Sequence, residues 1–272
     1  MLRTWLTMLA VLAGIGFVSA ADLSSPLFSE PKWNQAKNDL AQGRAAEAKA
    51  AFEELLKRYP DEPDLHLFRG MALLRLRDPH RAILEARKAI ELNPRHVDAR
   101  TFLAWIELEV RGDADAAIGE YQRIIELHPE LPAAYSNLAV AQKRKGNFDQ
   151  ALASLNKALE LKPDFAAALT ARGGIFAEQG RWAEARRDFE RALRLDPGDD
   201  GALYGLSQAM RETRDYAAAQ RALGELISRS PNFVYWLEWG RVGLIRYWWI
   251  LVSVALALSL KGRFRKARTA NG

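Results

Sequence analysis

Small, bulky apolar and proline positions recur along this chain with a period close to 34 residues. The prolines of the series are separated by 34, 35, 34, 34 and 34 residues, and they are Pro60, Pro94, Pro129, Pro163, Pro197 and Pro231. An alanine precedes each proline by twelve residues, at Ala48, Ala82, Ala117, Ala151, Ala185 and Ala219. A second small residue recurs at Ala36, Gly70, Ala104, Ala139, Gly173 and Ser207. Eight residues before the proline, five units carry a bulky apolar residue, namely Phe52, Tyr121, Leu155, Phe189 and Leu223. The second unit carries Ala86 at this position.

This pattern predicts six units, each a pair of antiparallel helices. Small residues let the two helices approach where they cross, and the bulky residue fills the space beside the crossing. Proline ends the second helix because it cannot continue the hydrogen-bond ladder. Gly43, Gly146 and Gly180 fall between the helices of a unit, where a left-handed backbone conformation is needed. The predicted units are 29–62, 63–96, 97–131, 132–165, 166–199 and 200–233.

The stretch YSNLAVAQKRKGNFDQALASLNKALELKPD resembles the tetratricopeptide repeat, and the resemblance extends over residues 29–233. It implies an all-α fold, a right-handed superhelical solenoid of antiparallel helix pairs, with a concave groove lined by the first helix of each unit. Asp39, Glu107 and Gln142 occupy a position that usually holds a large apolar residue. We therefore expect weaker packing of the first helix in units one, three and four.

The resemblance also implies which residues line the groove. The second and third units would contribute Asp64, Asp98 and Thr101 besides the residues that we expect to bind a partner. Those expected binding residues are Leu67, Met71, Leu74, Arg75, Trp105, Leu108, Ser136, Asn137, Val140, Lys143 and Arg144. Their apolar members suit an extended peptide or one face of a helix. The alternative is that Met71 and Trp105 pack against the next unit. Only Asn137 matches the clamp that holds chaperone C-termini in some family members, so binding of those C-termini is disfavoured.

The first 21 residues have the layout of a secretory signal peptide. Arg3 precedes an apolar stretch that ends in small residues, with cleavage expected after Ala20 or Ala21 and a linker at 22–28. The alternative is an uncleaved membrane anchor.

Near the other end, residues 242–260 are interrupted by a single charge, Arg246, and predict a transmembrane helix. An aromatic juxtamembrane segment at 234–241 precedes it, and Trp248 and Trp249 would lie at the interface. Lys261, Arg263, Arg265 and Lys266 belong to a basic tail, 261–272, expected in the cytoplasm. Two alternatives stay open: a buried terminal helix that covers the last repeat, and a removable sorting signal.

Charge and composition exclude other classes of function. The chain has 39 lysines and arginines, of which Arg3 and the seven after Gly240 account for eight. The body between them therefore has 31 basic and 34 acidic residues, a net charge of −3. Such a body has no basic footprint for nucleic acid. Cysteine is absent, and the four histidines are far apart in sequence, so neither a thiol site nor a metal site is expected. No catalytic triad or phosphate loop is found, so we expect no enzyme, cofactor or small-molecule substrate.

Together these features predict a non-enzymatic scaffold that binds other proteins. It would be tethered to the bacterial inner membrane through the C-terminal helix, in contact with the lipid bilayer, with the repeats in the periplasm or outside the cell. Two alternatives are a chaperone-like factor for exported chains in cytochrome or pilus assembly, and a cytoplasmic tail-anchored adaptor.

Overall fold

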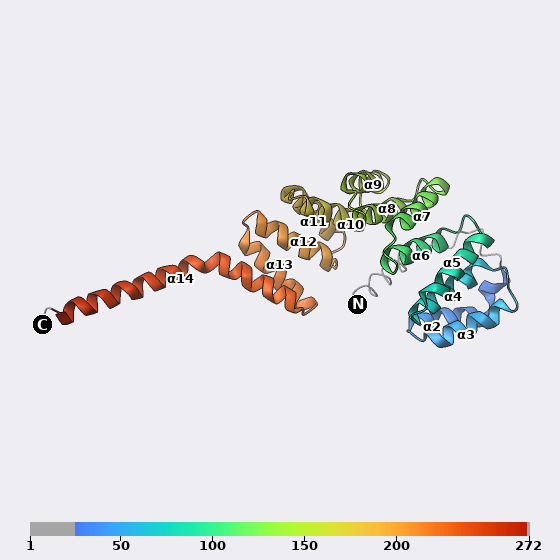
Figure 1. Ribbon diagram of the computed structural model, residues 1–272, viewed down its shortest axis with the longest axis horizontal. Coiled ribbons are helices and arrows are strands. Elements are labelled where there is room, and N and C mark those ends of the chain that lie inside the picture. Colours follow the sequence, from blue (N-terminus) through green and yellow to red (C-terminus); the bar gives the residue numbers. More distant parts are fainter. Residues whose placement is uncertain (1–24, 271–272) are drawn as a thin grey trace. The chain divides into compact units, whose positions relative to one another are not determined.

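A computed structural model describes residues 25–270, with side chains described for 25–250, 252–254 and 256. Within these residues the chain forms thirteen α-helices and one short 3₁₀ helix, without strands (Figure 1). It is an all-α solenoid of repeated helix pairs. The chain divides into two compact units, residues 1–147 and 148–272, each of which is described by itself.

The first unit contains three helix pairs and the first helix of a fourth. It begins with the 3₁₀ helix η2 (Pro26–Ser29). The helix pairs are α2 (Pro31–Ala41) with α3 (Ala45–Leu56), α4 (Pro63–Arg75) with α5 (Pro79–Leu92), and α6 (Val97–Glu109) with α7 (Ala114–Leu127), followed by α8 (Pro132–Arg144). Proline occupies the first turn of α2, α4, α5 and α8, where the missing amide hydrogen costs nothing.

The second unit continues the same alternation. It comprises α9 (Phe148–Leu161), α10 (Ala166–Glu178), α11 (Trp182–Leu195), α12 (Asp200–Glu212), α13 (Tyr216–Arg229) and α14 (Phe233–Ala270). Aspartate side chains cap several second helices in both units. Asp113 accepts from the Ala116 amide at 2.9 Å, and Asp215 accepts from the Ala218 amide at 3.3 Å.

The turn inside each helix pair is built around one residue in the left-handed conformation. The prediction for Gly43, Gly146 and Gly180 is confirmed, with φ values of 83°, 87° and 73°. The same turn recurs without glycine at Arg77 and Arg214, where φ is 63° and 65°. The backbone hydrogen bonds are alike in both kinds of turn. The Arg77 amide donates to Leu74 O at 3.0 Å, and the Gly43 amide donates to Leu40 O at 3.1 Å. These two arginines therefore carry the strain that glycine avoids.

We predict that Arg77→Gly raises the free energy of unfolding by about 0.5–1 kcal/mol. Relief of the left-handed strain favours the folded state, and the extra freedom of glycine in the unfolded chain offsets part of the gain. Urea denaturation followed by circular dichroism measures the change. The reverse substitution, Gly43→Arg, should lower the stability by a similar amount, and the idea is wrong if both changes have the same sign.

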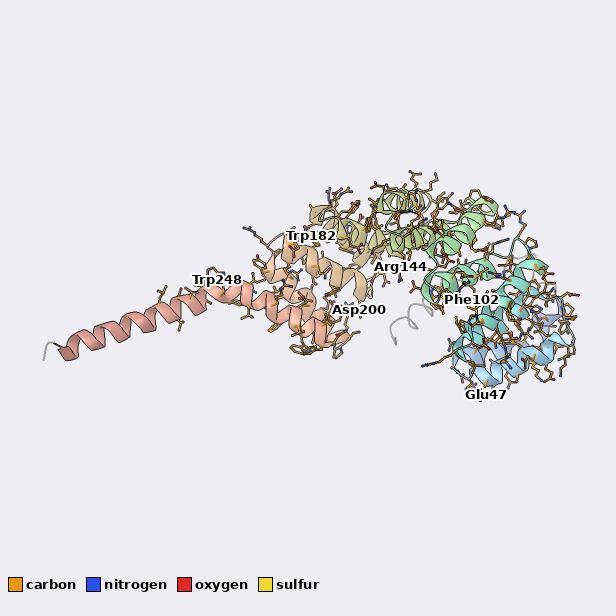
Figure 2. All side chains as sticks on the ribbon, in the orientation of Figure 1. Glu47, Phe102, Arg144, Trp182, Asp200 and Trp248 are labelled. Atoms are coloured by element: carbon orange, nitrogen blue, oxygen red, sulfur yellow. The ribbon has the colours of Figure 1, made fainter. Side chains whose placement is uncertain are left out.

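Aromatic rings form the centre of the first unit. Trp33 is 3% exposed, and its ring centroid lies 5.8 Å from that of Phe52, 5.0 Å from that of Phe68 and 5.9 Å from that of Phe28. Phe102, labelled in Figure 2, belongs to the same core. A Cβ at Gly70 would lie 3.1 Å from the Phe102 ring and 3.2 Å from the Ala82 carbonyl oxygen, so this column must stay small.

In the second unit, one phenylalanine lies between two glycines. The ring of Phe189, on α11, faces Gly173 on α10 and Gly205 on α12. A Cβ at Gly173 would lie 2.9 Å from the ring, and one at Gly205 would lie 2.4 Å from it. Gly173 belongs to the small column predicted from the sequence, whereas Gly205 lies two residues before its member Ser207, and together the two glycines admit an aromatic ring between three helices.

The last helix differs from the prediction for the C-terminal region. Residues 234–241 and 242–260 form one continuous helix, α14, which begins at Phe233. Its first turns pack on α13, because Tyr235 and Val242 are buried with Leu223 and Leu226. In the part of the chain that the structure describes, no helix combines the length and the apolar character needed to cross a membrane.

The transmembrane helix predicted at 242–260 is therefore not found. The physical reason is that its first residues belong to the repeat body: Val242 is buried there, and Arg246 Nη1 donates to Gln220 Oε1 of α13 at 3.1 Å. The alternative of a terminal helix covering the last repeat describes this part of α14. Beyond it, Tyr247, Trp248, Trp249, Ile250, Val252, Val254 and Leu256 are exposed, and Figure 2 labels Trp248 where α14 extends past α13.

Two further predictions concern residues that the structure does not describe. The signal peptide at 1–21 lies outside the described residues. The side chains of Lys261, Arg263, Arg265 and Lys266 also lie outside the described set, although the backbone there belongs to α14. Export and the placement of the basic tail stay predictions.

Candidate functional site

The eleven expected groove residues lie on α4, α6 and α8 of the first unit, and the structure divides them into two groups. The buried group is Leu67, Met71, Leu74, Leu108 and Ser136. Helix α4 illustrates the cause, since α3, α5 and α6 all pack against it and leave little of its surface free. For Met71, the structure therefore agrees with the alternative of packing in the core, and these five side chains offer a partner little area.

The remaining members reach the surface. Arg75, Trp105, Asn137 and Lys143 are half-buried, whereas Val140 and Arg144 are exposed. Trp105 packs with part of its indole on the core of the first unit. Val140 is 40% exposed at the position of the next repeat that corresponds to Trp105. We call Asp98, Trp105, Val140 and Arg144 the first-helix surface.

Polar contacts join the first helices of successive repeats near this surface. Arg144 Nη2, at the end of α8 (Figure 2), donates to Glu109 Oε1 of α6 at 2.6 Å. His96 Nε2, before α6, lies 3.5 Å from Asp64 Oδ1 of α4. His96 Nδ1 accepts from the Ala99 amide at 3.3 Å, which places the proton of the neutral imidazole on Nε2, toward Asp64.

Asp98 differs from Arg144, the other charged residue of the first-helix surface, because it has no partner in the described part of the chain. Among the described residues, none forms a hydrogen bond or ion pair with its carboxylate. Burial raises the pKa of Asp98 from 3.8 to about 6; His96 lowers this pKa, and the negative charge of Asp64 raises it. An unpaired, half-buried carboxylate is a costly group to keep unless it has a role.

The corresponding positions of α10, in the second unit, have little binding chemistry. Ala167, Gly174 and Ala177 offer no functional group. Thr170 Oγ1 donates to Asp199 Oδ2 at 2.7 Å and is therefore already satisfied within the unit. Among the described side chains, no group of three or more histidines, aspartates or glutamates is arranged to hold a metal ion. The first-helix surface is thus the strongest candidate.

Comparison with protein families agrees with this architecture. One tetratricopeptide repeat model matches residues 34–89, 69–132 and 136–200, and a second tetratricopeptide repeat model matches residues 176–237. The chain is a tetratricopeptide repeat protein. No curated protein matches its sequence.

Several solved structures share the fold. A chain of the APC/C hetero-tetramer Cut9–Hcn1 is similar with a TM-score of 0.67 and 20% identity, covering 78% of this chain and 42% of that one. This chain thus spans less than half of that relative. PilW, described as a widely conserved type IV pilus biogenesis factor, has a TM-score of 0.66, 17% identity and coverage of 75% and 94%. PilF of Pseudomonas aeruginosa has a TM-score of 0.65, 17% identity and coverage of 76% and 94%.

The repeat register could have drawn attention to Asp98. Asp64 and Asp98 are 34 residues apart and hold the same position of successive tetratricopeptide repeats. The sequence places both acids in the groove. It does not show that His96 faces Asp64 while Asp98 lacks a partner, because the orientation of side chains in the connecting turn decides this.

We predict that Asp98→Asn raises the free energy of unfolding by about 2 kcal/mol at pH 7.5 and by little at pH 4.5. The folded state binds the Asp98 proton more tightly than the unfolded state, so its carboxylate destabilises the fold above pH 6. This penalty decreases as the pH falls from about 6 toward 3.8, the ordinary pKa of the carboxyl group. Urea denaturation at the two pH values measures both changes.

The exposed Asp61 provides the control for that experiment. Asp61→Asn should change the stability by less than about 0.5 kcal/mol at either pH. An equal effect of Asp98→Asn at both pH values would show that its charge is not the cause.

Proposed function

We propose that this tetratricopeptide repeat protein is a non-enzymatic scaffold that binds a partner protein on the first-helix surface of its first unit. The observation that carries the proposal is the presence of a half-buried indole and an unpaired carboxylate on one helix. Trp105 supplies apolar area, and Asp98 supplies a negative charge that no described residue neutralises. Aromatic residues of this kind commonly dominate binding energy.

The spacing of these two residues suggests what the partner offers. Asp98 and Trp105 are seven residues apart on α6, so they lie on the same side of the helix, about 10 Å apart along its axis. A helix or extended segment carrying a basic residue and an apolar residue at that separation matches both. The exposed Val140 adds apolar area at the equivalent position of α8.

Site-specific photocrosslinking in cells that produce the protein tests the proposal. A photoreactive residue at Val140 should capture a distinct partner, identified by mass spectrometry. Adding Asp98→Asn and Trp105→Ala to the same chain should reduce the yield at least about tenfold. Leu84, which is 64% exposed on the second helix α5, is the control position and should capture little. Equal capture at both positions would contradict the proposal, and many weak products at Val140 would favour a chaperone-like role.

The second part of the proposal is that α14 holds the repeats at a lipid surface. It is motivated by the concentration of exposed apolar residues on this one helix, among them Phe233, Trp236, Leu244, Trp248 and Trp249. Soluble surfaces rarely expose so large an apolar patch. Indole rings favour the headgroup layer, and the basic residues after Leu260 would be attracted to anionic lipids. Docking at this layer does not require the helix to cross the bilayer.

Flotation with vesicles that contain anionic phosphatidylglycerol tests this part. The full chain should float with the vesicles, whereas a variant with Trp248→Glu and Trp249→Glu should stay in solution. The control is Leu84→Glu, which introduces a glutamate at an exposed apolar position away from α14. If all three proteins float equally, or if none does, the lipid proposal is wrong.

The proposed location is outside the cytoplasm, as the N-terminal sequence predicts. Alkaline phosphatase fused after Phe233 should then be active in a bacterial host. A second fusion after Gly272 reports the side of the basic tail: activity there supports a helix that stays on the outer surface, and inactivity would contradict it. Inactivity of both fusions would contradict export.

A further inference from the structure

A cavity of about 360 Å³ lies in the first unit between the second helices α5 and α7. Ile90 of α5, Leu103 of α6 and Ala116 of α7 give it apolar walls, and Arg87, Glu107 and Glu120 contribute charged groups. Cavities of a few hundred Å³ are large enough to enclose a side chain or a small ligand. None of these residues belongs to the first-helix surface, so the cavity is a separate feature.

Glu107 and Gly119 line this space, and Glu107 departs from the repeat pattern. The position of Glu107 holds a large apolar side chain in three other repeats, namely Leu73, Phe176 and Met210. Gly119, on α7, also lines the cavity, and a Cβ built on it would have no atom within 4 Å. Gly119 is exposed, so a larger side chain there would extend from the rim of the cavity.

Glu107 is a buried acid, with only 3% of the residue exposed. Arg111 Nη1 donates to its two oxygens at 2.8 and 3.1 Å. Arg87 Nη2 lies 3.7 Å from Oε1, too far for a hydrogen bond, and its side chain is largely exposed. Burying an ion pair seldom stabilises a core more than an apolar residue does. Packing alone therefore does not explain an acid at this position.

Glu120 provides the second carboxylate of the cavity. Its Oε2 accepts from Arg100 Nη1 at 2.7 Å, while the same arginine donates to the Pro94 carbonyl oxygen at 3.0 and 3.1 Å. Each acid of the lining thus has one arginine partner, Arg111 for Glu107 and Arg100 for Glu120, while Arg87 is a third and loosely held arginine. Aliphatic walls beside carboxylates complement a cation on an alkyl stem.

We infer that this cavity is a second docking site, which takes a lysine or arginine side chain of a partner protein. The alkyl stem contacts Ile90 and Leu103, and the cationic group bonds Glu107. It replaces the long contact of Arg87, while Arg111 keeps its hydrogen bonds. The site is formed by α5, α6 and α7, from residues outside the first-helix surface, and does not depend on the function proposed for that surface.

Nuclear magnetic resonance of the full chain labelled with ¹⁵N-glycine tests the inference, with the Gly119 amide as reporter. The probes are the peptides acetyl-Ala-Arg-Ala-amide and acetyl-Ala-Nle-Ala-amide, in which the uncharged norleucine (Nle) replaces the arginine. The arginine peptide should shift the Gly119 signal with an affinity about tenfold or more above that of the norleucine peptide. Equal affinities would overturn the proposal.

Three variants separate recognition from folding. Glu107→Gln should abolish the preference for arginine, and Arg87→Ala should tighten binding of the arginine peptide severalfold by removing the competing guanidinium. Gly119→Leu fills the cavity from an exposed helical position and should remove binding. In this variant the other glycine signals show whether the protein folds, and peptide binding is measured from the signals of the peptide. The matched control Glu126→Gln, on the exposed side of α7, should change nothing. Unchanged binding in Gly119→Leu would contradict the site even if Glu107→Gln failed to fold.

Discussion

Gly205→Val is expected to lower the free energy of unfolding by about 3 kcal/mol. Valine is no worse than glycine as a helix former, so propensity alone predicts no loss. The loss comes from Phe189, whose ring atoms would lie 2.4, 2.7 and 2.8 Å from a Cβ at this position. The ring cannot move away, because Gly173 approaches it from α10. Urea denaturation followed by circular dichroism measures the change.

Gly224, on α13, is the matched control for this substitution. The nearest atom to a Cβ at Gly224 is Trp239 Nε1 at 4.0 Å, so Gly224→Val should change the stability by less than about 0.5 kcal/mol. Phe189→Leu should relieve the clash, and the loss in the double variant with Gly205→Val should be smaller than the sum of the two single losses. Simple addition of the losses would show that Phe189 is not the residue in conflict.

Trp33→Ala is expected to cost about 4 kcal/mol, the largest effect among these predictions. The indole is buried at the centre of the first unit and makes edge contacts with the rings of Phe28, Phe52 and Phe68. Its removal loses apolar burial and leaves a cavity that rigid helices cannot close. Hydrogen–deuterium exchange should show faster exchange in α2, α3 and α4, which contribute to this core.

Trp236→Ala, on α14, controls for loss of a tryptophan as such. Trp236 is 54% exposed, so its removal should cost less than about 1 kcal/mol. A loss for Trp33→Ala as small as that for Trp236→Ala would show that the first unit does not depend on this aromatic cluster.

The sequence predicted the helix pairs and most of their turns, because spacing alone determines them. Prolines and small residues 34 positions apart mark helix ends and close crossings, and the structure has both. The turn at Arg77 could not be predicted from composition, since its residue lacks the conformational freedom of glycine. There the contacts of the surrounding helices impose the left-handed conformation.

The candidate surface was harder to predict than the fold. A repeat position specifies the side of a helix but not how closely the next helix covers it, so Leu67 and Met71 were expected in a groove and lie in the core. Glu107 was expected to weaken packing, yet the cavity beside it is also lined by Gly119, which follows no column of the repeat. In the C-terminal region, hydropathy could not show that α14 begins as part of the repeat body.

The contacts of the helices have a consequence for the order in which the protein folds. Within each unit, the extensive contacts join helices that are adjacent in sequence or separated by one helix. Such local contacts allow rapid folding, so each repeat can form soon after it is synthesised. Helix α14 follows all the repeats along the chain. The exposed apolar residues of α14 are therefore synthesised last, when folded repeats are already present to keep the chain soluble.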